Sequence, residues 1–280
     1  MKNRRRQRLA DMPEGAESPL SAAVAGRDRS VLDMVTDAVR HNQTMLAFQP
    51  VMQARAPHAV AFYEGLIRVL DDSGRVIPAR DFMPMVENAE LGRELDCASL
   101  ALGLRTLARN PSIRLSINMS ARSIGYKRWM RILDTHLNKN DGIGERLILE
   151  ISESSAMTVP ELVTDFMDQL QHRGISFALD DFGAGATAIR NFRSFFFDMV
   201  KIDGQFVRNI HANADNQVLT AALIGLARQF DMFTIAESVE SREDAAYLVA
   251  LGVDCLQGYL FGAPSMRPPW FPEKPHRATA

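Results

Sequence analysis

Short runs of apolar and β-branched residues alternate with longer segments of helical periodicity along most of the chain. The short runs, which are typical of strands, cover 45–51, 60–70, 113–120, 146–152, 176–182, 198–203, 233–238 and 255–261. From the second run onward, helix-like segments lie between them, at 78–92, 94–110, 126–138, 159–174, 216–230 and 241–252. Eight strands with intervening helices predict an α/β protein with a TIM-like (β/α)8 barrel.

The first two runs are joined by a shorter connection than the others, residues 52–59. A parallel crossover needs roughly a dozen residues or more, whereas antiparallel neighbours can be joined by a tight turn. We therefore expect one antiparallel strand in an otherwise parallel barrel.

Polar side chains interrupt these runs, mostly near their C-terminal ends. Barrel strands are buried on both faces and should be almost continuously apolar, and the C-terminal ends of parallel strands meet at one mouth. The residues concerned are Asn118, Glu150, Asp180, Asp181, Lys201, Asp203 and Glu237, with Glu64 and Gln257 inside their runs. Any single Asp or Asn could be a helix cap, but caps do not favour Glu and Lys. As a set, these residues predict a site at the mouth.

The chemistry of this set favours hard cations. Crowded carboxylates repel one another, and their pKa values rise unless cations neutralise them. Oxygen ligands without His or Cys suit Mg²⁺ or Mn²⁺ better than zinc or copper, and two such ions are the usual device for phosphodiester displacement. Lys201 could orient the attacking water or simply form a salt bridge to an acid, and the sequence leaves both open.

Composition narrows the class of protein further. Hydrophobic residues make up 46% and charged residues 24%, with a formal net charge of −2, which excludes a largely disordered chain and gives no sign of nucleic-acid binding. No apolar stretch approaches the roughly 18 residues of a membrane span. The only cysteines are Cys97 and Cys255, and no apolar run follows the basic N-terminus, so we expect a cytoplasmic protein.

The ends of the chain are expected to lie outside the folded domain. Residues 1–29 lack periodicity and predict a flexible basic tail. Order is expected from near Ser30, a candidate helix N-cap, so the folded domain is predicted to span 30–270 and the C-terminal tail 271–280. Gly183 to Ala188 imitates a dinucleotide-binding fingerprint, but Asp180 and Asp181 before it would face a pyrophosphate without a metal. We therefore do not interpret that segment as a nucleotide loop.

The order of motifs from about residue 44 to 265 resembles the EAL family of cyclic di-GMP phosphodiesterases. The name motif E-x-L-x-R is Glu64 to Arg68, preceded by Gln49-Pro50. The later motifs are N-x-S at 118–120, E-x-S-E at 150–153, D-D-F-G-x-G at 180–185, K-I-D at 201–203, A-E-x-V-E at 236–240 and Q-G-Y at 257–259. The family fold is a barrel with one antiparallel strand, in agreement with the connection length.

The resemblance implies metal-dependent hydrolysis of cyclic di-GMP to linear pGpG, with two Mg²⁺ or Mn²⁺ ions and a homodimer. Glu64, Asn118, Glu150 and Asp180 would bind the first ion, and Asp180 would bridge to a second ion beside Asp181. Lys201 would hold the hydrolytic water, and Glu64 would be catalytic as well as a metal ligand. Glu237 would bind the second ion or organise the water, as a further catalytic carboxylate. The remaining roles implied are substrate contacts from Gln49, Leu66, Arg68, Asp203 and Gln257, and support of the loop after Asp181 by Glu153.

The chain departs from the family pattern at few positions. Gly65 replaces the alanine of the name motif, Ser238 replaces a glycine, and Ala184 to Ala188 lacks the hydroxyl-bearing run of many relatives. None of these departures removes an implied metal ligand. The sequence therefore favours an active enzyme over a catalytically silent cyclic di-GMP receptor or a pure interaction module.

Overall fold

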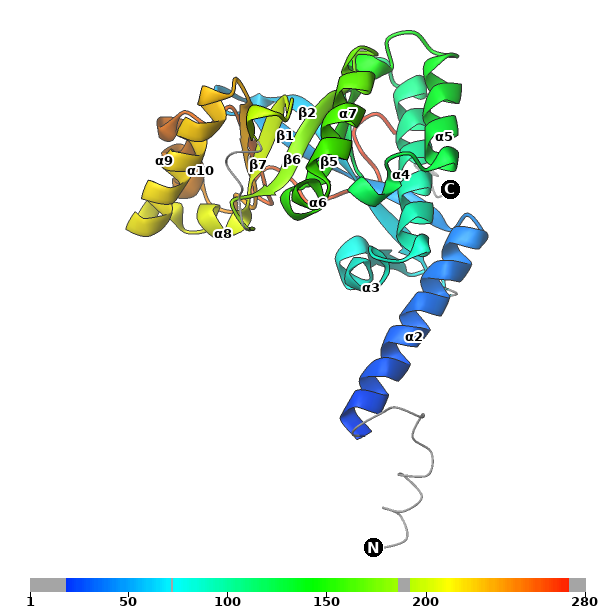
Figure 1. The fold of residues 1–280 in the computed structure, drawn as a ribbon. Coiled ribbons are helices and arrows are strands. Elements are labelled where there is room, and N and C mark those ends of the chain that lie inside the picture. The colour runs from blue at the N-terminus through cyan, green and yellow to red at the C-terminus, as the bar shows by residue number, and fades with distance from the viewer. Residues whose placement is uncertain (1–18, 72, 186–191, 272–280) are drawn as a thin grey trace, which may run out of the picture.

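The computed structural model describes residues 19–71, 73–185 and 192–271, and its centre is a closed barrel (Figure 1). The strands follow one another around the ring in the order β1-β9-β8-β7-β6-β5-β4-β2, and pairing of β1 with β2 closes it. Their bounds are Thr44–Gln53 (β1), Ala56–Leu70 (β2), Leu115–Asn118 (β4), Leu147–Ser152 (β5), Ser176–Phe182 (β6), Met199–Ile202 (β7), Phe233–Ala236 (β8) and Cys255–Gln257 (β9). A short additional strand, β3 (Val76–Pro78), pairs with β2 outside the ring. The predicted barrel is confirmed, with one strand in each predicted run.

The direction of β1 is reversed relative to the rest of the barrel. β1 pairs antiparallel with both β2 and β9, whereas the pairings from β2–β4 round to β8–β9 are parallel. Only residues 54 and 55 separate β1 from β2, and so short a connection cannot reach a parallel neighbour. The prediction of one antiparallel strand in the barrel is therefore confirmed.

Helices cover the outside of the barrel (Figure 1). They are α3 (Met83–Val86), α4 (Glu90–Arg109), α5 (Lys127–Leu137), α6 (Glu153–Thr158), α7 (Pro160–Gln171), α8 (Gly204–Val207), α9 (Ala214–Gln229) and α10 (Arg242–Leu251), with the 3₁₀ turns η1 (Ala79–Asp81), η2 (Ala121–Ser123), η3 (Gly144–Arg146) and η5 (Ile210–Ala212). Several begin where the sequence offers a cap. Ser241 accepts the Asp244 N–H at the start of α10, and Asn213 accepts the Asn216 N–H at the start of α9.

The first described helix begins earlier than the sequence predicts. α2 spans Pro19–Arg40 rather than starting near Ser30, so residues 19–29 are helical. Proline is tolerated in a first helical turn, and the alanines that follow are strong helix formers. Val35 and Ala38, in the second half of α2, are buried against the barrel, while the first half projects from it (Figure 1). Residues 1–18 and 272–280, assigned to the tails, lie outside the described residues.

None of the helices that the structure describes is both long enough and apolar enough to span a membrane.

The barrel interior consists of two layers with opposite polarity. Successive side chains of a strand point to opposite faces, so residues two apart share the interior face. The lower layer is apolar and contains Val51, Phe62, Ile148, Ala178 and Ile235. Two residues further toward the mouth, these strands and their neighbours carry the polar residues Gln49, Glu64, Asn118, Glu150, Asp180, Lys201, Glu237 and Gln257. The chain therefore builds a polar site on an apolar floor.

Candidate active site

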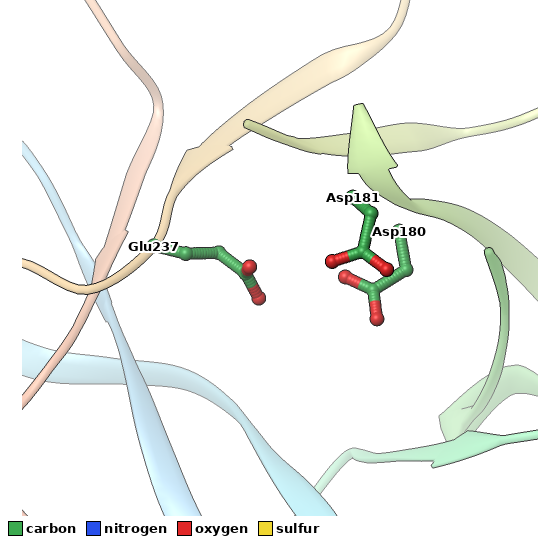
Figure 2. Close-up of side chains that lie close together, drawn as sticks. All are labelled: Asp180, Asp181 and Glu237. Carbon is green, nitrogen blue, oxygen red and sulfur yellow. The ribbon is translucent and has the colours of Figure 1, made fainter. Parts of the chain in front are cut away.

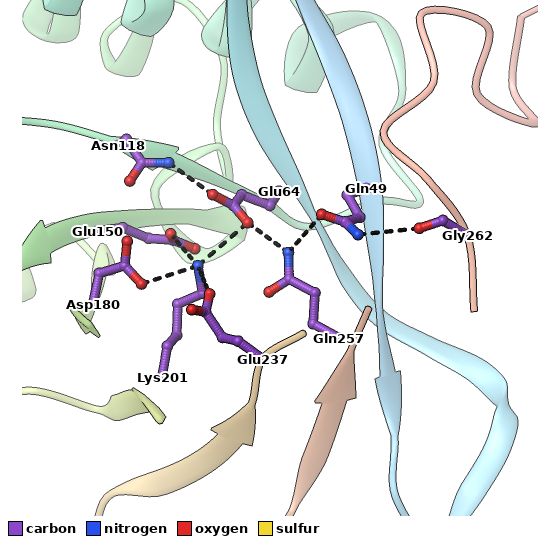
Figure 3. Close-up of polar contacts among 9 residues, drawn as sticks. All are labelled: Gln49, Glu64, Asn118, Glu150, Asp180, Lys201, Glu237, Gln257 and Gly262. Carbon is purple, nitrogen blue, oxygen red and sulfur yellow. Dashed lines mark hydrogen bonds and ion pairs between the residues drawn. The ribbon is translucent and has the colours of Figure 1, made fainter. Parts of the chain in front are cut away.

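Lys201 lies at the centre of the polar layer, where only 1% of its side chain is exposed. Four carboxylates converge on its ammonium group, from the middle of β2, from β5 and β6 and from the residue after β8 (Figure 3). From Lys201 Nζ the distances are 2.7 Å to Glu237 Oε1, 2.8 Å to Glu150 Oε2, 3.2 Å to Asp180 Oδ1 and 3.3 Å to Glu64 Oε2. Of the two roles that the sequence left open for Lys201, the structure contains the salt bridge. We call Lys201 and these four carboxylates the carboxylate cage.

Side-chain amides hold the Glu64 carboxylate from the other side. Gln257 Nε2 donates to Glu64 Oε2 at 2.5 Å, and Asn118 Nδ2 donates to Glu64 Oε1 at 2.8 Å. Gln257 Nε2 also lies 3.3 Å from Gln49 Oε1, and Gln49 Nε2 donates to the Gly262 carbonyl at 3.1 Å (Figure 3). Both oxygens of Glu64 are therefore held by partners from three other strands, β4, β7 and β9.

The pKa values in the cage diverge because burial and charge pairing act in opposite directions. Burial would raise the pKa of Glu64, but Lys201 and the hydrogen bonds from Gln257 and Asn118 together lower it. At Glu150 and Glu237, burial dominates and neighbouring carboxylates add to it, so the pKa of Glu150 lies well above its usual value and that of Glu237 rises to about 8. The surrounding carboxylates raise the pKa of Lys201 and keep it charged, against the effect of burial. The cage holds more negative than positive groups.

Two carboxylates of the cage, Asp180 and Glu237, lie close to a third acid, the exposed Asp181. Asp180, Asp181 and Glu237 each offer one carboxylate oxygen, and these oxygens lie within 4.8 Å of one another (Figure 2). Asp181 has a left-handed backbone with φ of 56°, and burial together with the neighbouring Asp180 raises its pKa to about 6. Glu150 Oε1 is buried and has no hydrogen-bond partner among the residues that the structure describes. Hard oxygen donors, excess negative charge and an unpartnered carboxylate oxygen fit divalent cations such as Mg²⁺ or Mn²⁺.

Glu153 connects the start of α6 to the loop that follows Asp181. Glu153 is buried, and its Oε2 accepts the Gly183 N–H at 2.9 Å. Gly183 has φ of +92°, and a side chain there would meet Phe206 and Leu223 at about 3 Å. The hydrogen bond from Gly183 joins Glu153 to the loop that Glu153 is predicted to support. The run Ala184 to Ala188 is described only as far as Gly185, and its other residues lie outside the described part of the chain.

Of the predicted substrate-contact residues, Gln257 donates to the cage and lies beside Gln49, whereas Leu66, Arg68 and Asp203 make no hydrogen bond or ion pair with the cage in the described part of the chain. Leu66 and Arg68 alternate with Glu64 on β2 and so continue its face beyond the mouth, where Arg68 Nη1 donates to the Ile67 carbonyl at 2.9 Å. The Asp203 carboxylate instead caps α8, accepting the Gln205 N–H at 2.7 Å. Of the set predicted for the mouth, Asp203 is thus the residue with a helix-cap contact.

The structure shows the local environment of two residues that depart from the family pattern, Gly65 and Ser238. A methyl group added at Gly65 would lie 2.8 Å from Ile117 Cδ1, so the glycine leaves room for this isoleucine on the neighbouring strand. Ser238 adopts φ of 55°, in the left-handed region that favours glycine. Its hydroxyl accepts a hydrogen bond from Arg208 Nη2 at 3.3 Å.

Sequence reasoning missed one wall of the site. A cavity of about 690 Å³ lies beside the cage and is lined by Asn118, Asp180 and Asp181 together with residues of α4, η2 and α6. Asp96, on α4, lines it and is buried. The sequence holds a usable signal, since Asp96, Leu100 and Leu104 follow helical spacing and a carboxylate interrupts an otherwise apolar stripe.

Comparison with known proteins gives consistent matches over most of the chain. The EAL domain family matches residues 32–264. The cyclic di-GMP phosphodiesterase PdeF of Escherichia coli K12 is 30% identical over 239 residues, which cover 84% of this chain and 32% of PdeF. The cyclic di-GMP phosphodiesterase PdeB of Shewanella oneidensis is 29% identical over 234 residues, which cover 82% of this chain and 27% of PdeB. The chain thus spans about a third or less of the length of these relatives.

A solved structure shares the fold. The FimX EAL domain from Pseudomonas aeruginosa bound to c-di-GMP superposes with a TM-score of 0.77 at 25% identity, and the match covers 84% of this chain and 96% of that domain. The barrel with its reversed first strand is therefore the architecture of a known domain.

Proposed function

The chain belongs to the EAL domain family, and we propose that it hydrolyses cyclic di-GMP to the linear dinucleotide pGpG. The substrate is inferred from relatives that are named cyclic di-GMP phosphodiesterases. The observation that carries the proposal is the carboxylate cage, in which Glu64, Glu150, Asp180 and Glu237 surround one buried lysine. Burying so many charged groups is costly, and residues that cost stability in this way occur mainly at functional sites.

The residues present suit two divalent cations. We assign Glu64, Asn118, Glu150 and Asp180 to a first Mg²⁺ or Mn²⁺, and Asp180, Asp181 and Glu237 to a second. When bound, such ions polarise a phosphodiester and lower the pKa of a water molecule, which supplies a nucleophile at neutral pH.

The chain's own residues would position and neutralise the reacting groups. Lys201 would hold the attacking water by donating from Nζ, while its charge balances part of the cage. Gln257 and Asn118 fix the orientation of Glu64 by donating to both of its oxygens. Leu66 and Arg68 on the rim, with Gln49 behind them, are proposed to contact the substrate. We also propose that the protein is a homodimer, which sedimentation velocity would test, and that it acts in the cytoplasm.

The deciding experiment follows pGpG formation and cyclic di-GMP binding on one sample. We expect pGpG with Mg²⁺ or Mn²⁺, none after chelation, and suppression by Ca²⁺, whose longer bonds and higher coordination number misplace the attacking water. Full activity after chelation would contradict the metal assignment. Tight binding of cyclic di-GMP without pGpG in either metal would instead establish a receptor.

A further inference from the structure

Asp96 is a buried carboxylate that the proposed chemistry does not use. Only 6% of the residue is exposed, and its Oδ2 accepts two hydrogen bonds, from Ser123 Oγ at 2.6 Å and from the Ser120 N–H at 3.0 Å. Burial raises its pKa to about 6 although both hydrogen bonds act against the rise. A carboxylate in this environment costs stability, and a leucine would continue the apolar stripe of α4.

The two donors belong to the segment that immediately follows the proposed metal ligand Asn118. This segment, Ser120 to Ser123, includes η2 and lies between α4 and α6. From the α6 side, Ser155 Oγ accepts the Ala121 N–H at 2.9 Å. Asp96 thus fixes from one side a short turn whose other side is held by the helix that carries Glu153.

We propose that Asp96 is a positioning residue that fixes the turn after β4, so that the Asn118 amide meets Glu64 and the first metal. Asn118 ends β4, and two bonds of the following turn anchor to Asp96, so the direction in which the chain leaves β4 depends on that carboxylate. Proteins break local rules of stability mainly at functional sites, and Asp96 breaks the apolar pattern of α4 beside the site. For its catalytic readout, the inference rests on the proposed function.

The chain contains a matched control at the opposite end of the barrel. Asp254 Oδ2 also accepts one backbone N–H and one hydroxyl, both from Thr234, at 2.9 Å and 2.8 Å. Thr234 lies near the start of β8, away from the mouth. Replacing Asp254 therefore removes the same kind of anchor without touching the site.

The test compares Asp96→Leu, Asp96→Asn, Asp254→Leu and wild type. Mn²⁺ affinity is measured by calorimetry without substrate, and kcat and KM by pGpG formation, at a temperature where circular dichroism shows each protein folded. We expect Asp96→Leu to lose about 10- to 100-fold in Mn²⁺ affinity and kcat, with a smaller change in KM, as is typical when support of a metal ligand is removed. Asp96→Asn keeps an acceptor oxygen and should stay within about threefold of wild type, as should Asp254→Leu despite its loss of stability.

Equal Mn²⁺ affinity in Asp96→Leu and wild type would overturn the proposal, and so would an equal loss in Asp254→Leu. If Asp96→Leu does not fold, Ser123→Ala removes one of the two anchoring bonds, and unchanged Mn²⁺ affinity there would overturn the proposal as well. A wild type that binds Mn²⁺ but releases no pGpG would refute the proposed function alone, because the calorimetric comparison would still decide the role of Asp96.

Discussion

Replacing Lys201 by methionine tests whether the cage needs its central cation for folding, for turnover or for both. Methionine keeps most of the volume of the lysine stem, so the change removes charge without opening a large cavity. Four carboxylates within 2.7 to 3.3 Å of Lys201 Nζ would lose their shared partner. Removing one partner of a buried ion pair typically costs about 3–5 kcal/mol, because the other charge stays buried.

The size of this loss should depend on pH and on metal. Glu237 has a pKa of about 8 with Lys201 beside it, and removal of that positive charge raises the pKa further, so in the variant Glu237 is protonated near pH 6 and relieves part of the repulsion. We therefore expect Lys201→Met to lose about 3–5 kcal/mol in free energy of unfolding at a pH well above 8 in chelator, and clearly less near pH 6. Excess Mn²⁺ should also reduce the loss, because it binds the folded carboxylates and not the unfolded chain.

Turnover should fall more than substrate binding. If Lys201 holds the attacking water, its loss should lower kcat by about 10²- to 10⁴-fold, the usual range for a positioned proton-transfer or water-orienting group. Affinity for cyclic di-GMP should survive, since an interaction made mainly in the transition state affects rate rather than binding. Glu64→Ala should instead lower both, because a proposed metal ligand is removed.

The assay combines urea unfolding at two pH values, with chelator and with Mn²⁺, and a pGpG time course with a binding isotherm. Lys127→Met is the control, since Lys127 is exposed at the start of α5 and its loss should change stability by no more than about 0.5 kcal/mol. Full turnover in Lys201→Met would refute the role of Lys201 with water. A stability loss that is the same at both pH values and unaffected by Mn²⁺ would refute the electrostatic argument.

Three further predictions follow from the same geometry. Asp180→Asn should reduce turnover more than Asp181→Asn, because Asp180 is proposed to bridge both ions, and equal losses in parallel pGpG assays would mean that the bridge is misassigned. Ser238→Gly should raise the free energy of unfolding by about 1 kcal/mol by relieving a left-handed serine with φ of 55°, and a thermal or urea midpoint at or below wild type would show that the Arg208 contact outweighs the strain. In chelator, the free energy of unfolding should fall as pH rises from about 4.5 to about 8, because folded Glu237 has a raised pKa and keeps a proton that the unfolded chain releases. Glu237→Gln should flatten this dependence of stability on pH, and an unchanged slope would exclude Glu237 as its source.

The sequence predicted the barrel well because its signals are local. Strands that are buried on both sides read as unbroken apolar runs, and the connection before β2 is too short for a crossover. The mouth was predictable for the same reason, since polar residues such as Glu150 and Lys201 interrupt those runs near their ends.

The contacts between the polar residues were not predictable from local pattern. Gln49 and Gln257 lie at opposite ends of the sequence and meet only because β1 pairs with β9, as well as with β2, when the barrel closes. A carboxylate at a strand end looks the same whether it faces the cage, as Asp180 does, or caps a helix, as Asp203 does. Asp96 was not predicted, because it lies on the buried face of a helix, whereas the candidate residues were identified from polar positions in the strands.

The reversal of β1 decides where the polypeptide enters the barrel. Thr44, the first residue of β1, pairs with Val69 of β2, beyond Glu64 in the direction of the mouth. In a barrel of parallel strands the first strand would begin at the floor, remote from the chemistry. Here α2 instead arrives on the side where α6 and α8 follow the ends of β5 and β7 (Figure 1). The connection from α2 into β1 thus lies on the mouth side of the barrel, outside its core, with Val35 and Ala38 buried where the helix meets the barrel.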